Sequence, residues 1–171
     1  MEQLQNLVGN RKTLLFLVLF LGFYGGLHTL YFMIPDSVLR ETIYHFGLVE
    51  VCVGIINMAA SGEYVIAHSN LLQSAKTTLE IVRGCDGIGT IMLIVSAIAA
   101  FSTNLKNKLV GLVLGVVFLY CMNLIRIIVL YFVSAYHSDW FTAVHTYFAP
   151  SMIVITGCLF FLAWAERSIG E

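Results

Sequence analysis

The sequence predicts an all-α integral membrane protein with about four transmembrane helices, and its composition and hydropathy pattern support this prediction. Of its 171 residues, 59% are hydrophobic and 11% are charged, and the mean hydropathy is +0.88. A soluble domain has about 25% charged residues, so this composition indicates a chain that resides in lipid. The net charge of −1 argues against a nucleic-acid partner.

Four apolar segments are predicted to cross the bilayer: about 14–34, 87–103, 109–133 and 145–165. The first is too long for the core of a signal peptide and lacks a small-residue cleavage site, so we expect it to be retained. The second is the weakest, because its apolar run is short for a hydrocarbon core of about 30 Å.

The segment 38–60 is apolar overall but carries four ionisable residues at mixed spacings. They are Arg40, Glu41, His45 and Glu50. A charge at the bilayer centre costs at least about 2.5 kcal/mol, which favours an interfacial or re-entrant helix. A fifth span is the alternative. Four spans place five Lys and Arg residues inside and three outside, whereas five spans place four on each side. The positive-inside rule therefore modestly favours four.

Residues 62–84 form the most polar part of the chain. Two short runs with β-branched residues flank a polar turn there, which predicts a small hairpin at the outer surface. No repeat, low-complexity tract or linker interrupts the chain, so we expect a single domain over 1–171, with its functional core at about 80–165.

Cys85 lies in a tight, glycine-flanked turn that leads into the second apolar segment. A thiol near a helix N-terminus meets the positive end of the helix dipole, which favours the thiolate. Backbone N–H groups at such a turn can also bind an oxyanion. Gly84 and Gly87 would let a substrate backbone approach closely. Cys85 is therefore a candidate nucleophile, although a cysteine in such a turn can simply be small.

Arg126 and His145 are the other two candidate catalytic residues. A guanidinium stays charged, so its burial in an apolar helix needs a partner or a functional reason. Asn123 lies one turn earlier on the same face and could brace it, while snorkelling to the surface is the ordinary alternative. The four-span topology places Cys85, Arg126 and His145 towards one side of the membrane. A Cys–His pair is a familiar source of a thiolate, and Asp139 could orient the imidazole.

The other cysteines do not indicate a metal or disulfide framework. All four are widely scattered, without a CxxC pair: Cys52, Cys85, Cys121 and Cys158. Three lie within apolar runs, where a cysteine acts as a small hydrophobe. We therefore expect no disulfide framework, no metal site and no cofactor.

Taken together, Glu80 followed by Cys85-Asp-Gly-Ile, then Asn123-x-x-Arg126, then His145 before the last helix, resembles the exosortase/archaeosortase family. The resemblance implies a multi-pass membrane cysteine transpeptidase, with Cys85 as nucleophile, Arg126 stabilising the oxyanion or substrate, and His145 as general acid/base. Its supporting or substrate-binding residues would be Glu80, Arg83, Gly84, Asp86, Gly87 and Asn123.

The same resemblance implies the partners and location. The substrates would be exported, membrane-anchored proteins whose C-terminus carries a short motif, a transmembrane helix and a basic tail. The enzyme would cleave near the motif and transfer the protein to an acceptor nucleophile. It would reside in the cytoplasmic (inner) membrane, with its site facing the outer, periplasmic or extracellular side.

The chain departs from the family pattern in three places. It is short and resembles a compact family core without the additional helices of larger members. Asp86 follows the nucleophile where many relatives have a small residue, and it could oppose the thiolate or pair with Arg83 or Arg126. The run Phe148-Ala149-Pro150 replaces an expected small-residue pattern.

Two other classes remain open from the sequence. The chain could be a non-catalytic membrane assembly or scaffold subunit in which the three residues join helices. It could also be a small transporter with Glu50 and Arg126 as intramembrane charges. The transporter ranks last because Glu50 is the only candidate for a second intramembrane charge.

Overall fold

A computed structural model describes residues 2–169 of the chain, and the side chains of residues 11–168. Helix α1 (Glu2–Met33) is followed by α2 (Asp36–Val38), the π-helical segment η1 (Leu39–Val49) and α3 (Glu50–Ala59). Strands β1 (Ile66–His68), β2 (Leu71–Gln73) and β3 (Thr78–Glu80) come next. The chain continues through α4 (Ile88–Ala100), α5 (Leu105–Tyr136), α6 (Ser138–Ala143), the π-helical η2 (Val144–Phe148) and α7 (Ala149–Ile169).

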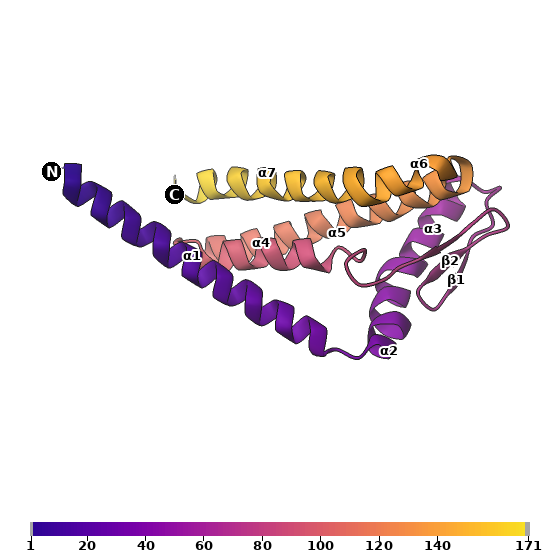
Figure 1. Ribbon diagram of the computed structural model, residues 1–171, viewed down its shortest axis with the longest axis horizontal. Coiled ribbons are helices and arrows are strands. Elements are labelled where there is room, and N and C mark those ends of the chain that lie inside the picture. Colours follow the sequence, from indigo (N-terminus) through magenta and orange to yellow (C-terminus); the bar gives the residue numbers. More distant parts are fainter. Residues whose placement is uncertain (1, 170–171) are drawn as a thin grey trace.

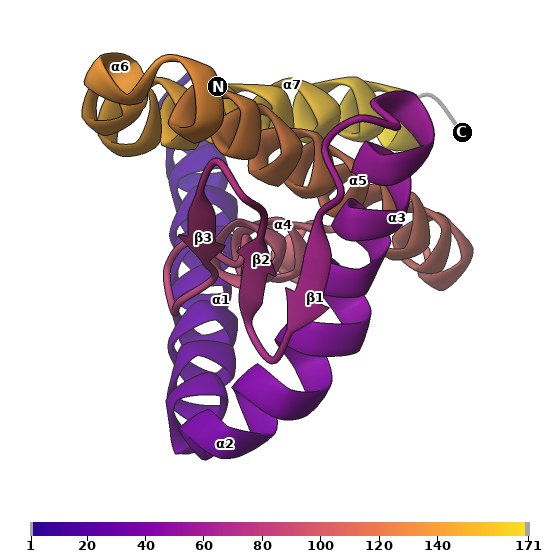
Figure 2. The same cartoon turned by 90° about the vertical axis from the view of Figure 1, so that its right-hand side faces the viewer.

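The helices fall into two directions (Figure 1). Helices α4, α5 and α7 run side by side along the long axis of the molecule, and α1 packs obliquely against α4. The continuous segment α2–η1–α3 instead runs across one end of this bundle. Figure 2 shows the three strands at this same end, which we call the sheet end. The N-terminal end of α1 and the C-terminal end of α7 lie towards the opposite end.

Within residues 2–169, four helical segments are long and apolar enough to cross a membrane. They are Arg11–Met33, Asp36–Ala59, Leu105–Tyr136 and Ser138–Ser168. Three of them include most or all of the predicted spans 14–34, 109–133 and 145–165. The fourth is the ambiguous segment 38–60, which meets the criteria of length and composition but lies across the bundle (Figure 1). Because this segment runs across the bundle and not along it, its direction agrees with the interfacial or re-entrant helix expected from its four ionisable residues.

The predicted span 87–103 is shorter in the structure. Helix α4 covers only Ile88–Ala100, or 13 residues, which is about 20 Å of helix. The helical path cannot extend towards the N-terminus because Gly84 and Gly87 both have positive φ angles. Arg126 lies 21 residues after the start of α5, or about 32 Å along it. Arg126 contacts the turn that precedes α4, and α5 continues for ten residues beyond it, to Tyr136. This turn therefore packs against the side of α5 and not against its C-terminal end.

The predicted hairpin is present and is extended by a third strand. Strands β1 and β2 pair antiparallel, with Ala67 opposite Leu72, and β2 pairs antiparallel with β3, with Leu72 opposite Leu79. Leu72 is fully buried, in one hydrophobic core with residues of the crosswise segment and of α5, such as Tyr44, Cys52 and Tyr131. The sheet thus covers the crosswise helix at the sheet end.

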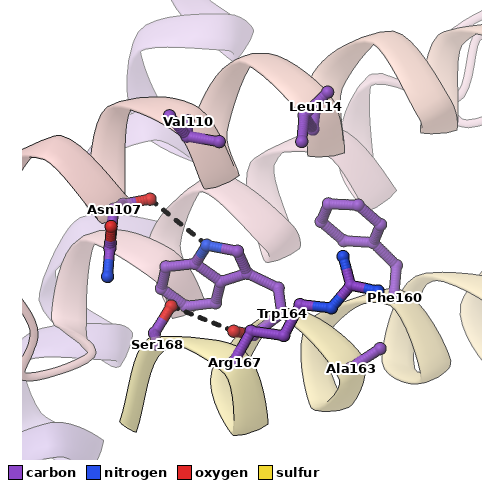
Figure 3. Close-up of a pocket in the computed structure, with 8 residues that line it drawn as sticks. All are labelled: Asn107, Val110, Leu114, Phe160, Ala163, Trp164, Arg167 and Ser168. Carbon is purple, nitrogen blue, oxygen red and sulfur yellow. Dashed lines mark hydrogen bonds between the residues drawn. The ribbon is translucent and has the colours of Figure 1, made fainter. Parts of the chain in front are cut away.

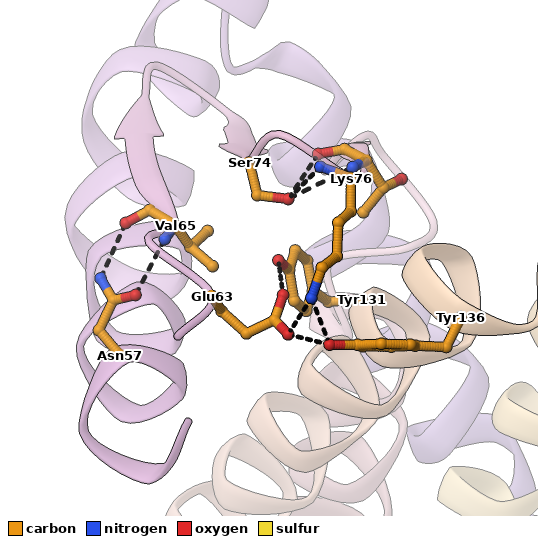
Figure 4. Close-up of polar contacts among 8 residues, drawn as sticks. Asn57, Glu63, Val65, Ser74, Lys76, Tyr131 and Tyr136 are labelled. Carbon is orange, nitrogen blue, oxygen red and sulfur yellow. Dashed lines mark hydrogen bonds and ion pairs between the residues drawn. The ribbon is translucent and has the colours of Figure 1, made fainter. Parts of the chain in front are cut away.

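A polar cluster around Glu63 attaches the sheet region to the end of α5 (Figure 4). The Glu63 carboxylate is almost completely buried and forms an ion pair with Lys76 at 2.8 Å. It also accepts hydrogen bonds from the hydroxyl groups of Tyr131, at 2.9 Å, and Tyr136. The hydrogen bond from Lys76, followed by that from Tyr136, lowers the pKa of Glu63 to about 2. The same ion pair raises the pKa of Lys76.

We expect Glu63→Gln to lower the thermal stability of the detergent-solubilised protein at neutral pH. Because the folded pKa of Glu63 lies below its unfolded value near 4.5, its contribution is complete above that value. It is lost as the pH falls from about 4.5 towards 2. The melting temperature of the variant should therefore depend less on pH in this window. Glu41→Gln, at an exposed position, is the control; an equal loss of pH dependence there would contradict the assignment.

Candidate functional site

The turn that carries Cys85 connects β3 to α4 and is closed by its own backbone. The N–H of Cys85 donates to the carbonyl of Val82 at 2.9 Å. Gly87 has a φ of +77°, and a Cβ atom at this position would lie only 2.4 Å from Cγ of Asn123. Glycine is required here both for the left-handed backbone and for the close approach of α5. The turn opens into α4 as expected, but Cys85 lies three residues before the first helical residue.

The side chains of Cys85 and His145 meet across the turn. The distance between Cys85 Sγ and His145 Nε2 is 3.1 Å, although 60 residues separate them in the chain. His145 lies in η2, and its ring stacks on Phe141 of α6, with the ring centroids 5.3 Å apart. Asp139, which was a candidate to orient the imidazole, is exposed, and the described residues show no hydrogen bond or ion pair between Asp139 and His145. Phe141 therefore fixes one face of the ring in place of a carboxylate.

Arg126 points to the same turn from α5. Only 8% of its surface is exposed, and Nη1 donates to the carbonyl of Cys85 at 3.2 Å. Its Nε is buried without a hydrogen-bond partner among the described residues. The side chain does not snorkel, because its guanidinium is held inside the protein. An unsatisfied buried donor is costly, and this one leaves Arg126 with capacity for a further acceptor.

Asn123 holds the next peptide of the turn instead of the guanidinium. Its Nδ2 donates to the carbonyl of Asp86 at 2.7 Å, and it is 2% exposed. Its Oδ1 is buried without a partner in the part of the chain that the structure describes. Asn123 and Arg126 thus bind two consecutive carbonyl groups, those of Asp86 and Cys85. The sequence prediction placed both residues on one face correctly, but their contacts are with the turn.

Asp86 is buried and pairs with neither Arg83 nor Arg126. It accepts hydrogen bonds from the hydroxyl groups of Tyr31 and Tyr44, and its Oδ1 accepts the N–H of Ile88 at 3.2 Å. These two tyrosines were not found by sequence reasoning. A tyrosine in an apolar segment resembles an ordinary interfacial aromatic residue, so its pattern carries no sign of a polar partner.

Two of the expected supporting residues lie outside this constellation. Arg83 donates from Nε to Asp36 at 2.8 Å and from Nη1 to the carbonyl of Tyr31 at 3.0 Å. The hydrogen bond to Asp36 raises the pKa of Arg83. Glu80 accepts from Asn70 at 3.1 Å. Arg83 therefore fastens the turn to the end of α1, and Glu80 contributes to the sheet. Gly84, with a φ of +85°, shapes the turn itself.

Two cavities lie between α5 and α7, and one of the two includes a residue of the candidate site. One has a volume of about 380 Å³ and is lined by residues near the start of α5 and the end of α7 (Figure 3). There Trp164 Nε1 donates to the carbonyl of Asn107 at 3.2 Å, and Arg167 is the charged lining residue. Its described lining residues include no cysteine, histidine or carboxylate side chain. This pocket therefore lacks the thiol and imidazole that the turn provides.

The other cavity is an apolar groove of about 210 Å³ that includes Arg126. Helix α5 forms one wall, and η2 with α7 forms the other. The remaining lining residues are Met122, Ile125, Val129, Val144, Phe148, Ala149, Met152 and Ile153. Arg126 is the only polar residue among them, and Val144 directly precedes His145. The groove thus adjoins the Cys85–His145 pair.

The arrangement provides a thiol, an imidazole at hydrogen-bond distance and a buried guanidinium with an unused donor. These groups suffice for nucleophilic attack on a carbonyl, proton transfer and stabilisation of an oxyanion. In the described residues, no three His, Cys, Asp or Glu side chains come together as a metal site would require. Glu50, the other charge of the transporter hypothesis, pairs with His45 at 3.5 Å and is exposed.

The family model for transmembrane exosortases matches residues 11–165 of the chain. The match includes every candidate site residue and extends beyond the region 80–165 on which the sequence resemblance was based. No curated protein and no solved structure gave a match.

We expect Gly87→Ala to destabilise the turn by about 1–2 kcal/mol, since an L side chain disfavours the left-handed backbone. The new methyl group must also displace Asn123. Thermal unfolding in detergent measures this loss, and adding Asn123→Ala should recover part of it by removing the colliding atoms. Gly89→Ala is the matched control, because nothing lies within 4 Å of its Cβ position. Equal behaviour of the two glycine variants would contradict the role of Gly87.

Proposed function

This chain belongs to the transmembrane exosortase family, and on that premise we propose that it is a membrane-embedded cysteine peptidase or transpeptidase with Cys85 as its nucleophile. The family consists of sortase-like membrane transpeptidases. The observation that carries the residue assignment is the distance of 3.1 Å between Cys85 Sγ and His145 Nε2. At this distance the imidazole can accept the thiol proton directly.

The proposed reaction begins when His145 accepts the proton of Cys85. The thiolate attacks the scissile carbonyl carbon, and the oxyanion forms near the turn. The N–H of Cys85 already donates to Val82, and that of Ile88 to Asp86. Among the described residues, the N–H groups of Asp86 and Gly87 donate no hydrogen bond. We propose that these N–H groups and the guanidinium of Arg126 stabilise the oxyanion.

Collapse of the tetrahedral intermediate breaks the C–N bond of the substrate. His145 then gives its proton to the leaving amine, and a thioester with Cys85 remains. An incoming amine, or water in a hydrolytic reaction, loses a proton to His145 as it attacks the thioester. Departure of the Cys85 thiolate completes the transfer, and return of the proton from His145 to Cys85 restores the enzyme.

The proposed substrates are membrane-anchored proteins with a C-terminal motif, a transmembrane helix and a basic tail. The apolar groove between α5 and α7 supports this proposal, since a substrate helix that packs against its lining would lie beside Arg126. The proposed orientation places the sheet end outside the cytoplasmic membrane. At the opposite end, Lys12 and Lys108 line one cavity and Arg167 lines another, as the positive-inside rule favours for a cytoplasmic side.

Cys85→Ala should insert normally but leave a co-expressed substrate with the C-terminal signal uncleaved. Removal of a nucleophile typically costs several orders of magnitude in rate. In the wild-type protein, a small thiol reagent should modify Cys85 faster than the buried Cys52 or the exposed Cys121 and Cys158. Immunoblotting of the substrate and peptide mass spectrometry provide these measurements. Normal cleavage by the Cys85→Ala variant would instead favour a scaffold subunit.

Arg126→Lys keeps the positive charge but loses the planar fork of donors. We expect cleavage of the substrate to fall about 100- to 1,000-fold, the cost of losing an oxyanion donor. The amount of protein in the membrane fraction should stay near that of the wild type. Arg40→Lys, at an exposed position in the crosswise segment, is the control and should cleave normally. Near-normal cleavage by Arg126→Lys would remove Arg126 from the reaction.

A further inference from the structure

A buried carboxylate directly follows the nucleophile and is held by two tyrosines from other parts of the fold. Asp86 is 2% exposed, and its Oδ2 accepts hydrogen bonds from the hydroxyl groups of Tyr31, in α1, and Tyr44, in η1. The bond from Tyr44 is 2.7 Å long, and the two tyrosine hydroxyl groups lie 2.9 Å apart. No ion pair within the described residues includes Asp86, so these hydroxyl groups and the N–H of Ile88 are its donors.

Two cationic or potentially cationic side chains, those of His145 and Arg126, contact the same turn as the Asp86 carboxylate. His145 contacts Cys85, the residue before it, and Arg126 contacts the carbonyl of Cys85. A carboxylate without donors is costly to bury and attracts an imidazolium or a guanidinium. Either pairing would take away a group that the proposed reaction needs. Hydrogen bonds from two hydroxyl groups satisfy the carboxylate without a cation.

The directions from which the groups approach make this separation possible. The two tyrosines come from α1 and from the crosswise segment, whereas Arg126 comes from α5 and His145 from η2. Tyr31 and Tyr44 are themselves buried, with 7% and 1% of their surfaces exposed. Their hydroxyl groups therefore have fixed positions in a packed core, and the carboxylate is held on their side of the turn.

We propose that Tyr31 and Tyr44 are positioning residues for Cys85, which hold the Asp86 carboxylate away from His145 and Arg126. This inference rests on the proposed role of Cys85 as the nucleophile. It also assigns a function to the crosswise helix, which supplies Tyr44. The titratable and charged groups that can affect the pH dependence of Cys85 are Asp86 and Arg83 of the turn, Tyr31, Tyr44, Arg126 and His145.

The test is the rate at which iodoacetamide modifies Cys85 in the full-length protein in native membranes, measured from pH 5 to pH 9. The variant Tyr31→Phe/Tyr44→Phe keeps both rings and removes both hydroxyl groups. We expect its rate at neutral pH to fall at least about tenfold, as for loss of a hydrogen bond to a charged group. The pH midpoint of the reaction should move upwards, and substrate cleavage should fall in parallel.

Tyr120→Phe is the matched control, because Tyr120 donates to the carbonyl of Gly47 at 2.6 Å and so also binds the crosswise segment. Its rate and pH midpoint should equal those of the wild type. If the double Phe variant is poorly recovered from membranes, Tyr44→Phe alone, which leaves the bond from Tyr31, provides the same comparison. Wild-type rates in the Phe variants would overturn the proposal.

A rescue experiment separates positioning of the charge from simple packing. Adding Asp86→Asn to the double Phe variant removes the negative charge but keeps an acceptor for the N–H of Ile88. We expect it to restore most of the rate and the original pH midpoint. A lowered rate that Asp86→Asn leaves unchanged would overturn the proposal and assign the tyrosines to packing alone.

The same data distinguish this inference from the proposed function. Wild-type Cys85 that reacts no faster than the exposed Cys121 would reject Cys85 as the nucleophile, and the inference with it. A reactive Cys85 whose rate does not depend on Tyr31 and Tyr44 would reject the inference alone. The proposed function would then remain intact.

Discussion

The structure depends on hydrogen-bond partners for one polar turn, which carries Cys85 and Asp86 and packs against α5. Backbone groups at membrane depth need partners within the protein, because lipid offers none. Here the carbonyl of Cys85 accepts from Arg126, and that of Asp86 accepts from Asn123. The Asp86 side chain takes its donors from Tyr31 and Tyr44. Four residues from three different segments are thus committed to two consecutive residues of the turn.

This requirement explains why an apolar helix lies across the bundle. The crosswise segment is apolar enough to enter a membrane, yet Leu39, Tyr44, Val49, Cys52 and Ile56 are buried against the sheet and the rest of the protein. Its exposed residues include Arg40, Glu41 and Glu50. A helix with this distribution can close the end of a bundle and bring a hydroxyl group to Asp86. A fifth parallel helix would leave the turn uncovered on that side.

The sequence predicted the membrane class, three of the long helices, the hairpin and four of the residues that meet at the turn, namely Cys85, Asn123, Arg126 and His145, but not Tyr31 and Tyr44. These predictions rest on long apolar runs and on polar residues that are unusual within them. The contacts of Asn123 and Asp86 were not predictable in the same way. The spacing of Asn123 and Arg126 defines a shared face of α5 but not what that face touches. The π-helical geometry of η1 and η2 also has no signal in the sequence, although it sets the directions of Tyr44 and His145.

The short helix α4 has a consequence for the lipid around the protein. Its 13 residues reach about 20 Å, whereas the hydrocarbon core of a typical bilayer is about 30 Å thick. Between α1 and α7, α4 lines an apolar cleft of about 420 Å³ with residues such as Leu93 and Ala97. Lipid that enters this cleft meets a hydrophobic mismatch, which a bilayer relieves by thinning locally. Such thinning brings the water surface closer to the turn that precedes α4.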